Sequence, residues 1–192
     1  KIDAELNKDA IKIINTLNQI RNESFFGKFI VDKITGAEKT TKFGMGARTV
    51  TGADYILLNY NQADIIPTVK GGEKVSKNFN AAVVHELGHL WGNIFGTKEG
   101  GVWQNLIVDE EGNTRPISYD EVIGVYAENM YRNQMKLPLR THYSPDTNGD
   151  GVPSTAIPKN RAYARVQEIY EKNNIAKSYI TFMLSIILPN LR

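Results

Sequence analysis

Apolar residues recur every three or four positions at the start of the chain, which predicts an amphipathic helix over the first twenty-odd residues. Phe25 to Ile34 and Arg48 to Val50 are flanked by glycine-containing turns and have the residue types of strands. Asp54 to Tyr60 is the strongest strand candidate in this part of the chain. The apolar positions that indicate the N-terminal helix are Ile2, Leu6, Ala10, Ile13, Leu17 and Ile20.

Two further helices are predicted in the middle of the chain. Ser76 or Asn78 can cap a helix that runs to about Phe95, where a group of glycines follows. A second helix is predicted to begin at Ser118 and to continue to about Lys136, because a proline two residues later stops it. Helices and strands together predict an α+β protein.

The remaining segments suggest a single unit. Val102 to Asp109 predicts a strand or hairpin arm, with Glu111-Gly112-Asn113 as its turn. No internal repeat or linker divides the chain, so residues 1–192 are expected to form one domain. The apolar stretch from Ile180 to Leu188 is shorter than the about 20 residues that span a bilayer, so we expect a buried C-terminal helix and no membrane insertion.

Composition narrows the classes of function. The 192 residues are 41% hydrophobic and 23% charged, which is typical of a globular protein long enough to bury a core. The absence of cysteine excludes thiolate zinc ligands and cysteine nucleophiles. A net charge of +2, with scattered basic residues, does not favour nucleic acid as a partner. Lys1 to Ile30 lacks the pattern of a signal peptide, so an excised domain or processed product is expected.

His85-Glu86-Leu87-Gly88-His89 is the most informative stretch, because it has the H-E-x-x-H pattern of catalytic zinc sites. On a helix, histidines four residues apart lie on one face and can bind one metal ion. The glutamate beside them can act as a general base. The alternative is a pair of ordinary helix histidines, which would need other partners for their polar atoms in an apolar helix.

A catalytic zinc ion has three protein ligands, so one more side chain is needed. The extended pattern H-E-x-x-H-x-x-G-x-x-H fails at its last position, where Phe95 cannot bind zinc. Glu121 and Glu128 lie seven residues apart on one face of the second predicted helix, and either could reach the metal. Asp120 faces away from both glutamates, and His142 follows a proline-containing loop, so these two are weaker candidates.

Each glutamate also has a structural alternative. Glu121 forms a capping box with Ser118, in which its carboxylate would bond the serine backbone amide. Glu128 could instead be a buried carboxylate held by Arg132, four residues further along the helix. Spacing alone therefore leaves the third ligand open.

The chain resembles the NleD-like effector metalloproteases and the related toxin domains at the C-termini of bacterial Rhs-type proteins. Those proteins have H-E-x-x-H, then a glutamate seven residues before a Glu-Asn-x-x-Arg segment, and then Pro-Leu-Arg. Here the corresponding residues are Glu121, Glu128-Asn129-Met130-Tyr131-Arg132 and Pro138-Leu139-Arg140. The resemblance covers about Asn78 to Tyr143.

This resemblance implies a zincin-like metalloprotease fold, in which a small twisted sheet packs on the H-E-x-x-H helix and a second helix carries the third ligand. In zincins with a glutamate ligand, a small residue follows three places later, and Gly124 favours Glu121 over Glu128 in this role. Val125 replaces the aspartate of many such zincins, which leaves Glu128 to orient a histidine. The strand Tyr55 to Tyr60 is expected to receive substrate at a sheet edge, with a plain core strand as the alternative.

The implied mechanism uses a zinc ion held by His85, His89 and Glu121. Glu86 takes a proton from the attacking water and later passes it to the leaving amine. Tyr143, just beyond the second helix, is a candidate for stabilising the oxyanion, and so is the adjacent histidine; a purely structural tyrosine is the alternative.

The implied function is that of a zinc-dependent endopeptidase, a bacterial effector or toxin domain that is secreted or translocated into a target cell and cleaves specific proteins there. The expected partners are a protein or peptide substrate and a cognate immunity protein, and the chain is expected to be a monomer. The alternative is a non-catalytic zincin-fold binding domain with a structural zinc ion. An intact Glu86 argues against it, because a structural site has no use for a general base.

One more segment could bind a metal ion. Asp146 to Gly151 matches the opening of an EF-hand calcium loop, with oxygen ligands at alternate positions and glycine at the sixth. Ile157 stands at the twelfth position, where such loops have a bidentate glutamate, so calcium would bind weakly at most. A glycine-rich turn also explains these residues without a metal.

Overall fold

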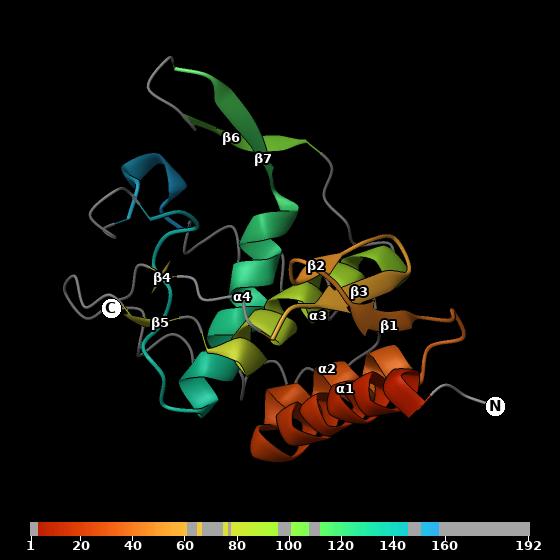
Figure 1. Cartoon of the computed structure of the whole chain (residues 1–192). Helices are drawn as coiled ribbons and strands as arrows, with labels where there is room; N and C mark the ends of the chain where they lie inside the picture. The colour runs from red at the N-terminus through yellow and green to blue at the C-terminus, as the bar shows by residue number, and fades with distance from the viewer. Residues whose placement is uncertain are drawn as a thin grey trace.

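Four α-helices and three small β-sheets make up the part of the chain that the computed structural model describes, namely residues 4–60, 65–66, 75–76, 78–95, 101–107, 112–145 and 151–157 (Figure 1). The predicted α+β class is confirmed. The helices are α1 (Ala4–Glu23), α2 (Phe25–Thr35), α3 (Phe79–Phe95) and α4 (Asp120–Gln134), with a short 3-10 helix η1 (Pro153–Thr155). The strands are β1 (Lys42–Met45), β2 (Val50–Thr51), β3 (Tyr55–Leu58), β4 (Ile65–Ile66), β5 (Val75–Ser76), β6 (Val102–Ile107) and β7 (Thr114–Ser118).

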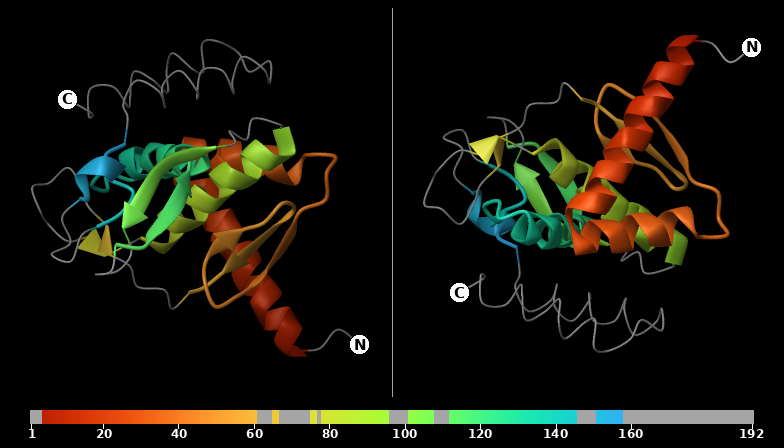
Figure 2. Two further views of the ribbon diagram at one scale, coloured as in Figure 1. Left: turned by 90° about the horizontal axis from the view of Figure 1, so that it is seen from above. Right: turned by 90° about the horizontal axis from the view of Figure 1, so that it is seen from below.

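Helix α1 confirms the predicted N-terminal helix. Its apolar face packs into the protein at Ile13 and Ile20, whereas Ile11 and Ile14 on the other face are exposed. The N-terminal part of α1 projects beyond the rest of the described chain (Figure 2). Among the α1 residues whose burial is described, the core includes Ile13 and Ile20.

The predicted strand from Phe25 to Ile34 is wrong, because this segment is helix α2. Ser24 is its N-cap, and the Ser24 hydroxyl accepts a hydrogen bond from the Gly27 amide at 2.7 Å. The buried positions Phe26, Ile30, Val31 and Ile34 have helical spacing. Aromatic and β-branched residues favour strands only when they fit a pleated surface, and here the cap and the tertiary packing outweigh that preference.

Strand β3 confirms the predicted strand, but its place in the sheet differs from the expected edge position. It lies between β1, to which it is parallel, and β2, to which it is antiparallel. Ile56 and Leu58 are fully buried against the helices. The strand is therefore a core strand, and an edge role for Tyr55 to Tyr60 is wrong. The strand predicted at Arg48 to Val50 is displaced toward the C-terminus and forms β2.

Helices α3 and α4 cross closely at small residues. Asn78 caps α3, as predicted, through its Oδ1 atom and the Ala81 amide at 3.0 Å. A Cβ atom added at Gly88 of α3 would lie 2.9 Å from Ala127 Cβ and 3.4 Å from Gly124 Cα of α4. The absence of side chains at both glycines lets the two helix backbones approach, and this brings their functional residues together.

Helix α3 lies at the centre of the structure. It contacts α1, α2 and α4 as well as strands β2 and β3, so a small sheet does pack on the H-E-x-x-H helix as expected. Its side chains Val83, Val84, Leu87 and Leu90 are fully buried in the same core as residues of α1, α2, β3 and α4. The H-E-x-x-H motif therefore lies on a helix that is packed against several other elements. Whether residues 1–192 form one domain stays a prediction.

Strands β6 and β7 form the predicted hairpin, which stands at the N-terminal end of α4 (Figure 1). Gly112, in the predicted turn, has a φ angle of +80°, which favours glycine. Helix α4 begins two residues after the predicted Ser118 and ends two residues before Lys136, whose φ angle of 56° stops it. No helix among the described residues is long and apolar enough to cross a membrane. Residues 146–150 of the suggested calcium loop and the apolar stretch 180–188 lie outside the described residues.

Candidate metal centre

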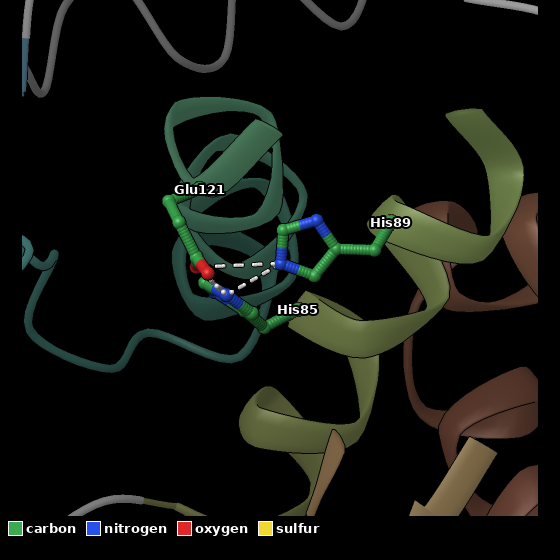
Figure 3. A group of neighbouring side chains, drawn as sticks. All are labelled: His85, His89 and Glu121. Carbon is green, nitrogen blue, oxygen red and sulfur yellow. Dashed lines mark hydrogen bonds and ion pairs between the residues drawn. The ribbon is translucent and has the colours of Figure 1, made fainter. Parts of the chain in front are cut away.

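The two histidines of the motif point from one face of α3 toward α4 (Figure 3). His85 is buried and His89 is partly exposed. Their rings are nearly perpendicular, with centroids 4.8 Å apart and a distance of 3.1 Å between the two Nε2 atoms. Two imidazole nitrogens thus face a common point, as the spacing predicts.

Glu121, in the first turn of α4, brings its carboxylate to both histidines (Figure 3). Its Oε2 atom lies 3.1 Å from His85 Nε2 and 3.4 Å from His89 Nε2. The capping-box alternative is not realised, because α4 has no side-chain cap. The Ser118 hydroxyl accepts a hydrogen bond from the Asp120 amide at 3.2 Å. Of the described residues, these three side chains form the group that could hold a metal ion.

The dimensions of this group fit a tetrahedral zinc ion. Zinc bonds to nitrogen and oxygen of roughly 2.0–2.1 Å place any two tetrahedral ligand atoms about 3.3 Å apart. The three distances between His85 Nε2, His89 Nε2 and Glu121 Oε2 are 3.1, 3.1 and 3.4 Å. Two imidazoles and one carboxylate are also a donor set that catalytic zinc sites use, with the fourth position open.

Gly124 makes room for His85. A Cβ atom at this position would lie 2.6 Å from His85 Nε2 and 2.8 Å from His85 Cε1, too close for any real side chain. The imidazole therefore packs directly on the backbone of α4. This is the physical reason for the small residue three places after Glu121.

Glu128 is fully buried and belongs to a different set of contacts. Its Oε1 atom accepts from Arg132 Nε at 2.7 Å, as predicted, and its Oε2 atom accepts from Arg140 Nη1 at 2.9 Å. The same Oε2 lies 3.3 Å from His85 Nδ1, an ion-pair distance without the alignment of a good hydrogen bond. Glu128 therefore lies on the Nδ1 side of His85, whereas Glu121 lies on its Nε2 side.

Arg140 ties the segment after α4 to the metal centre. Besides its bond to Glu128, it donates from Nε to the His142 carbonyl at 3.0 Å and from Nη2 to the Tyr143 carbonyl. Its backbone amide donates to Asn129 Oδ1 at 2.8 Å, and Asn129 Nδ2 donates to its carbonyl at 2.8 Å. The Glu-Asn-x-x-Arg and Pro-Leu-Arg segments of the sequence are thus one buried network.

Charge complementarity holds the centre together. Burial disfavours a charged His85, but the carboxylates of Glu121 and Glu128 outweigh this effect and raise the pKa of His85 to about 9. Burial likewise opposes the ionisation of Glu121, yet the two histidines hold its pKa well below the usual range. A proton on His85 thus stabilises the cluster, and a bound metal cation would take the place of this proton.

The predicted general base, Glu86, is half-buried on the same helix and contacts β2. The Thr51 hydroxyl lies 2.8 Å from Glu86 Oε2 and 2.9 Å from the Glu86 carbonyl oxygen. Nothing in the sequence singles out this threonine, because it lies 35 residues from its partner along the chain. The contact exists only because β2 packs against α3.

Tyr143, the candidate for stabilising the oxyanion, is partly buried and lies near Glu121. Burial, reinforced by the negative charge of Glu121, raises the pKa of Tyr143 to about 12, so its hydroxyl keeps its proton at neutral pH. His142 and Asp120 do not belong to the metal-binding group. The His142 ring instead packs on Gly151, and its Nδ1 lies 2.9 Å from Thr141 Oγ1.

Comparison with known protein families, curated proteins and solved structures finds no match to this chain. The resemblance to effector metalloproteases therefore stays a prediction.

Proposed function

We propose that this chain is a zinc-dependent endopeptidase with a zincin-like fold. The observation that carries the proposal is the convergence of His85, His89 and Glu121 at tetrahedral spacing next to a fourth side chain, Glu86, with the chemistry of a general base. The ligands come from two helices that cross at glycines, so the geometry rests on a rigid frame.

Within this proposal, His85, His89 and Glu121 hold the zinc ion, which when bound polarises the scissile carbonyl as a Lewis acid. Glu128 keeps His85 in the tautomer that presents Nε2 to the metal. Glu86 accepts a proton from the attacking water and returns it to the leaving amine. Tyr143, protonated at neutral pH, donates a hydrogen bond to the developing oxyanion.

The substrate backbone is proposed to pair with β2 instead of β3. Of the described strands, only β3 pairs with β2, so within the described part of the chain the other edge of β2 has no strand partner and is available for an added strand. Val50 on this strand is exposed, and Thr51 contacts Glu86. A peptide seated along β2 would therefore lie beside the proposed base.

The biological setting is proposed from the sequence resemblance. It suggests a bacterial effector or toxin domain, secreted or translocated into a target cell, that acts as a monomer on particular proteins and is neutralised by a cognate immunity protein. Pairing with one strand edge fits selectivity, because backbone bonds provide affinity while side-chain pockets choose the sequence.

The test is to treat a cell lysate with zinc-loaded protein and with its Glu86→Gln variant, and to map new protein N-termini by mass spectrometry. We expect a small set of cleavages with a shared local sequence that only the intact protein produces. Hundreds of cleavages with no common sequence would refute selectivity. A protein that binds one zinc ion per chain and generates no new N-terminus would refute the peptidase and favour a non-catalytic zinc-binding domain.

A further inference from the structure

The side chain of Thr51, on strand β2, contacts the proposed base in helix α3. Its Oγ1 atom lies 2.8 Å from Glu86 Oε2 and 2.9 Å from the Glu86 carbonyl oxygen. A hydroxyl has one hydrogen to donate, so the carboxylate and the helix carbonyl share or alternate for it. A hydrogen bond to the Glu86 carbonyl oxygen alone would only hold β2 against α3. A hydrogen bond to the Glu86 carboxylate also restrains the side chain of the proposed base.

We propose that Thr51 is a positioning residue for Glu86. Its hydroxyl holds Oε2 of the carboxylate and leaves Oε1 as the oxygen that receives the proton of the attacking water. This inference rests on the proposed role of Glu86 as general base. It adds a function to a strand residue that the metal-binding motif does not include.

The position of Thr51 is itself well determined. Its backbone pairs with Ile56 of the buried strand β3, and the adjacent Gly52 carbonyl accepts from Asn93 Nδ2 of α3 at 2.9 Å. Threonine is also β-branched, which restricts its first side-chain torsion. Glu86, by contrast, is half-exposed and has three side-chain torsions to restrain. A fixed donor facing a flexible carboxylate suits a positioning role.

The proposed substrate site on β2 makes the effect of Thr51 separable from substrate binding. Thr51→Val keeps the shape, the β-branch and every backbone group of the strand, and removes only the hydroxyl. Pairing of a peptide with the backbone of β2 is therefore preserved. The substitution should lower kcat, because the base is less well placed, and leave KM unchanged.

The first test compares zinc-loaded wild type, Thr51→Val and Thr51→Ser on a peptide that the wild type cleaves. We expect kcat of Thr51→Val to fall roughly tenfold or more, KM and zinc content to stay the same, and Thr51→Ser to recover most of the activity. Thr41→Val is the matched control, because the Thr41 hydroxyl is buried without a hydrogen-bond partner among the described residues. A Thr51→Val kcat equal to wild type, or a change confined to KM, would overturn the inference.

The second test needs no activity and uses thermal unfolding of the zinc-loaded protein in a double-mutant cycle. If the hydroxyl bonds the carboxylate, Thr51→Val should lower Tm clearly in wild type and much less in a Glu86→Ala background. Equal decreases in both backgrounds would mean that Thr51 bonds only the main chain, and would refute the positioning role. If wild type cleaves nothing, the proposed peptidase fails and the role of Thr51 fails with it. An active wild type with no coupling rejects the Thr51 inference alone.

Discussion

Glu121 and Glu128 approach the same imidazole from opposite sides. The carboxylate of Glu121 lies 3.1 Å from His85 Nε2, whereas that of Glu128 lies 3.3 Å from His85 Nδ1. Two turns of α4 separate them, and the imidazole of His85 lies between their carboxylates. One glutamate is therefore placed to share a metal ion with the histidine, and the other to orient the ring.

The position of Glu121 predicts that, of two neighbouring substitutions in α4, only the one at Glu121 lowers zinc affinity. Glu121→Ala removes a ligand and should weaken zinc binding roughly tenfold or more with the fold intact. Asp120→Ala removes the neighbouring acidic side chain, which is outside the metal-binding group, and should leave zinc affinity unchanged. Competition with a zinc-binding dye measures both. If Glu128→Ala loses the metal while remaining folded and Glu121→Ala keeps it, the ligand assignment is wrong.

Glu128 is expected to matter more for stability than Glu121. Glu128→Gln leaves the buried guanidiniums of Arg132 and Arg140 without their carboxylate, which costs on the order of 3–5 kcal/mol of unfolding free energy for a buried pair. Glu121 is 27% exposed, so Glu121→Gln should cost less. Urea unfolding of the metal-free proteins compares the two. Equal losses would show that the two guanidiniums do not depend on Glu128.

Gly124→Ala tests the close packing of His85 on α4. The new methyl group would lie 2.6 Å from His85 Nε2, so the ring or the helix must shift and the distances between the three candidate ligands must change. Zinc affinity should fall roughly tenfold or more, even though alanine favours the helix by about 1 kcal/mol over glycine. Gly88→Ala, which meets Ala127 instead, is the comparison and should mainly lower Tm. Unchanged zinc binding in Gly124→Ala would mean that the two helices separate easily.

Zinc binding should depend on pH through His85. Its pKa is raised to about 9, so below that pH the metal-free protein holds a proton that zinc must displace. Apparent zinc affinity should therefore increase as the pH rises from 7 to 9, by about tenfold per unit if one proton is released, and level off above. Calorimetry in buffers of different ionisation enthalpy counts this proton. No proton release at pH 7.5 would contradict a protonated His85.

Glu86→Gln separates chemistry from metal binding. The substitution keeps the shape of the side chain but removes the proton acceptor, so the fold and the zinc content should persist while cleavage is nearly abolished. Zinc content and the rate of peptide hydrolysis, measured on the same sample, distinguish loss of the base from loss of the metal. Full activity would remove Glu86 from the mechanism, and loss of zinc would make it structural.

The elements that carry the centre could be predicted because their signals are local. The helix of His85 and His89 shows its cap, its apolar spacing and the glycines that follow it within one stretch of chain. The helix of Glu121 lies between Ser118 and Pro138, as predicted, although no side chain caps its start. The sequence of helix α2 also fits a strand, because its aromatic and β-branched residues suit both structures, and only the cap at Ser24 marks it as a helix.

Tertiary structure alone decided which glutamate meets the metal-binding nitrogens. Both glutamates share one face of α4, so sequence spacing cannot rank them, and the crossing of the two helices at Gly88 and Gly124 sets which end of α4 lies over the histidines. The central position of β3 in its sheet and the contact of Thr51 with Glu86 also depend on tertiary packing, because each joins residues that are not neighbours in the sequence. Periodicity records which side of an element is buried, but the partner across an interface depends on packing between segments far apart in the chain.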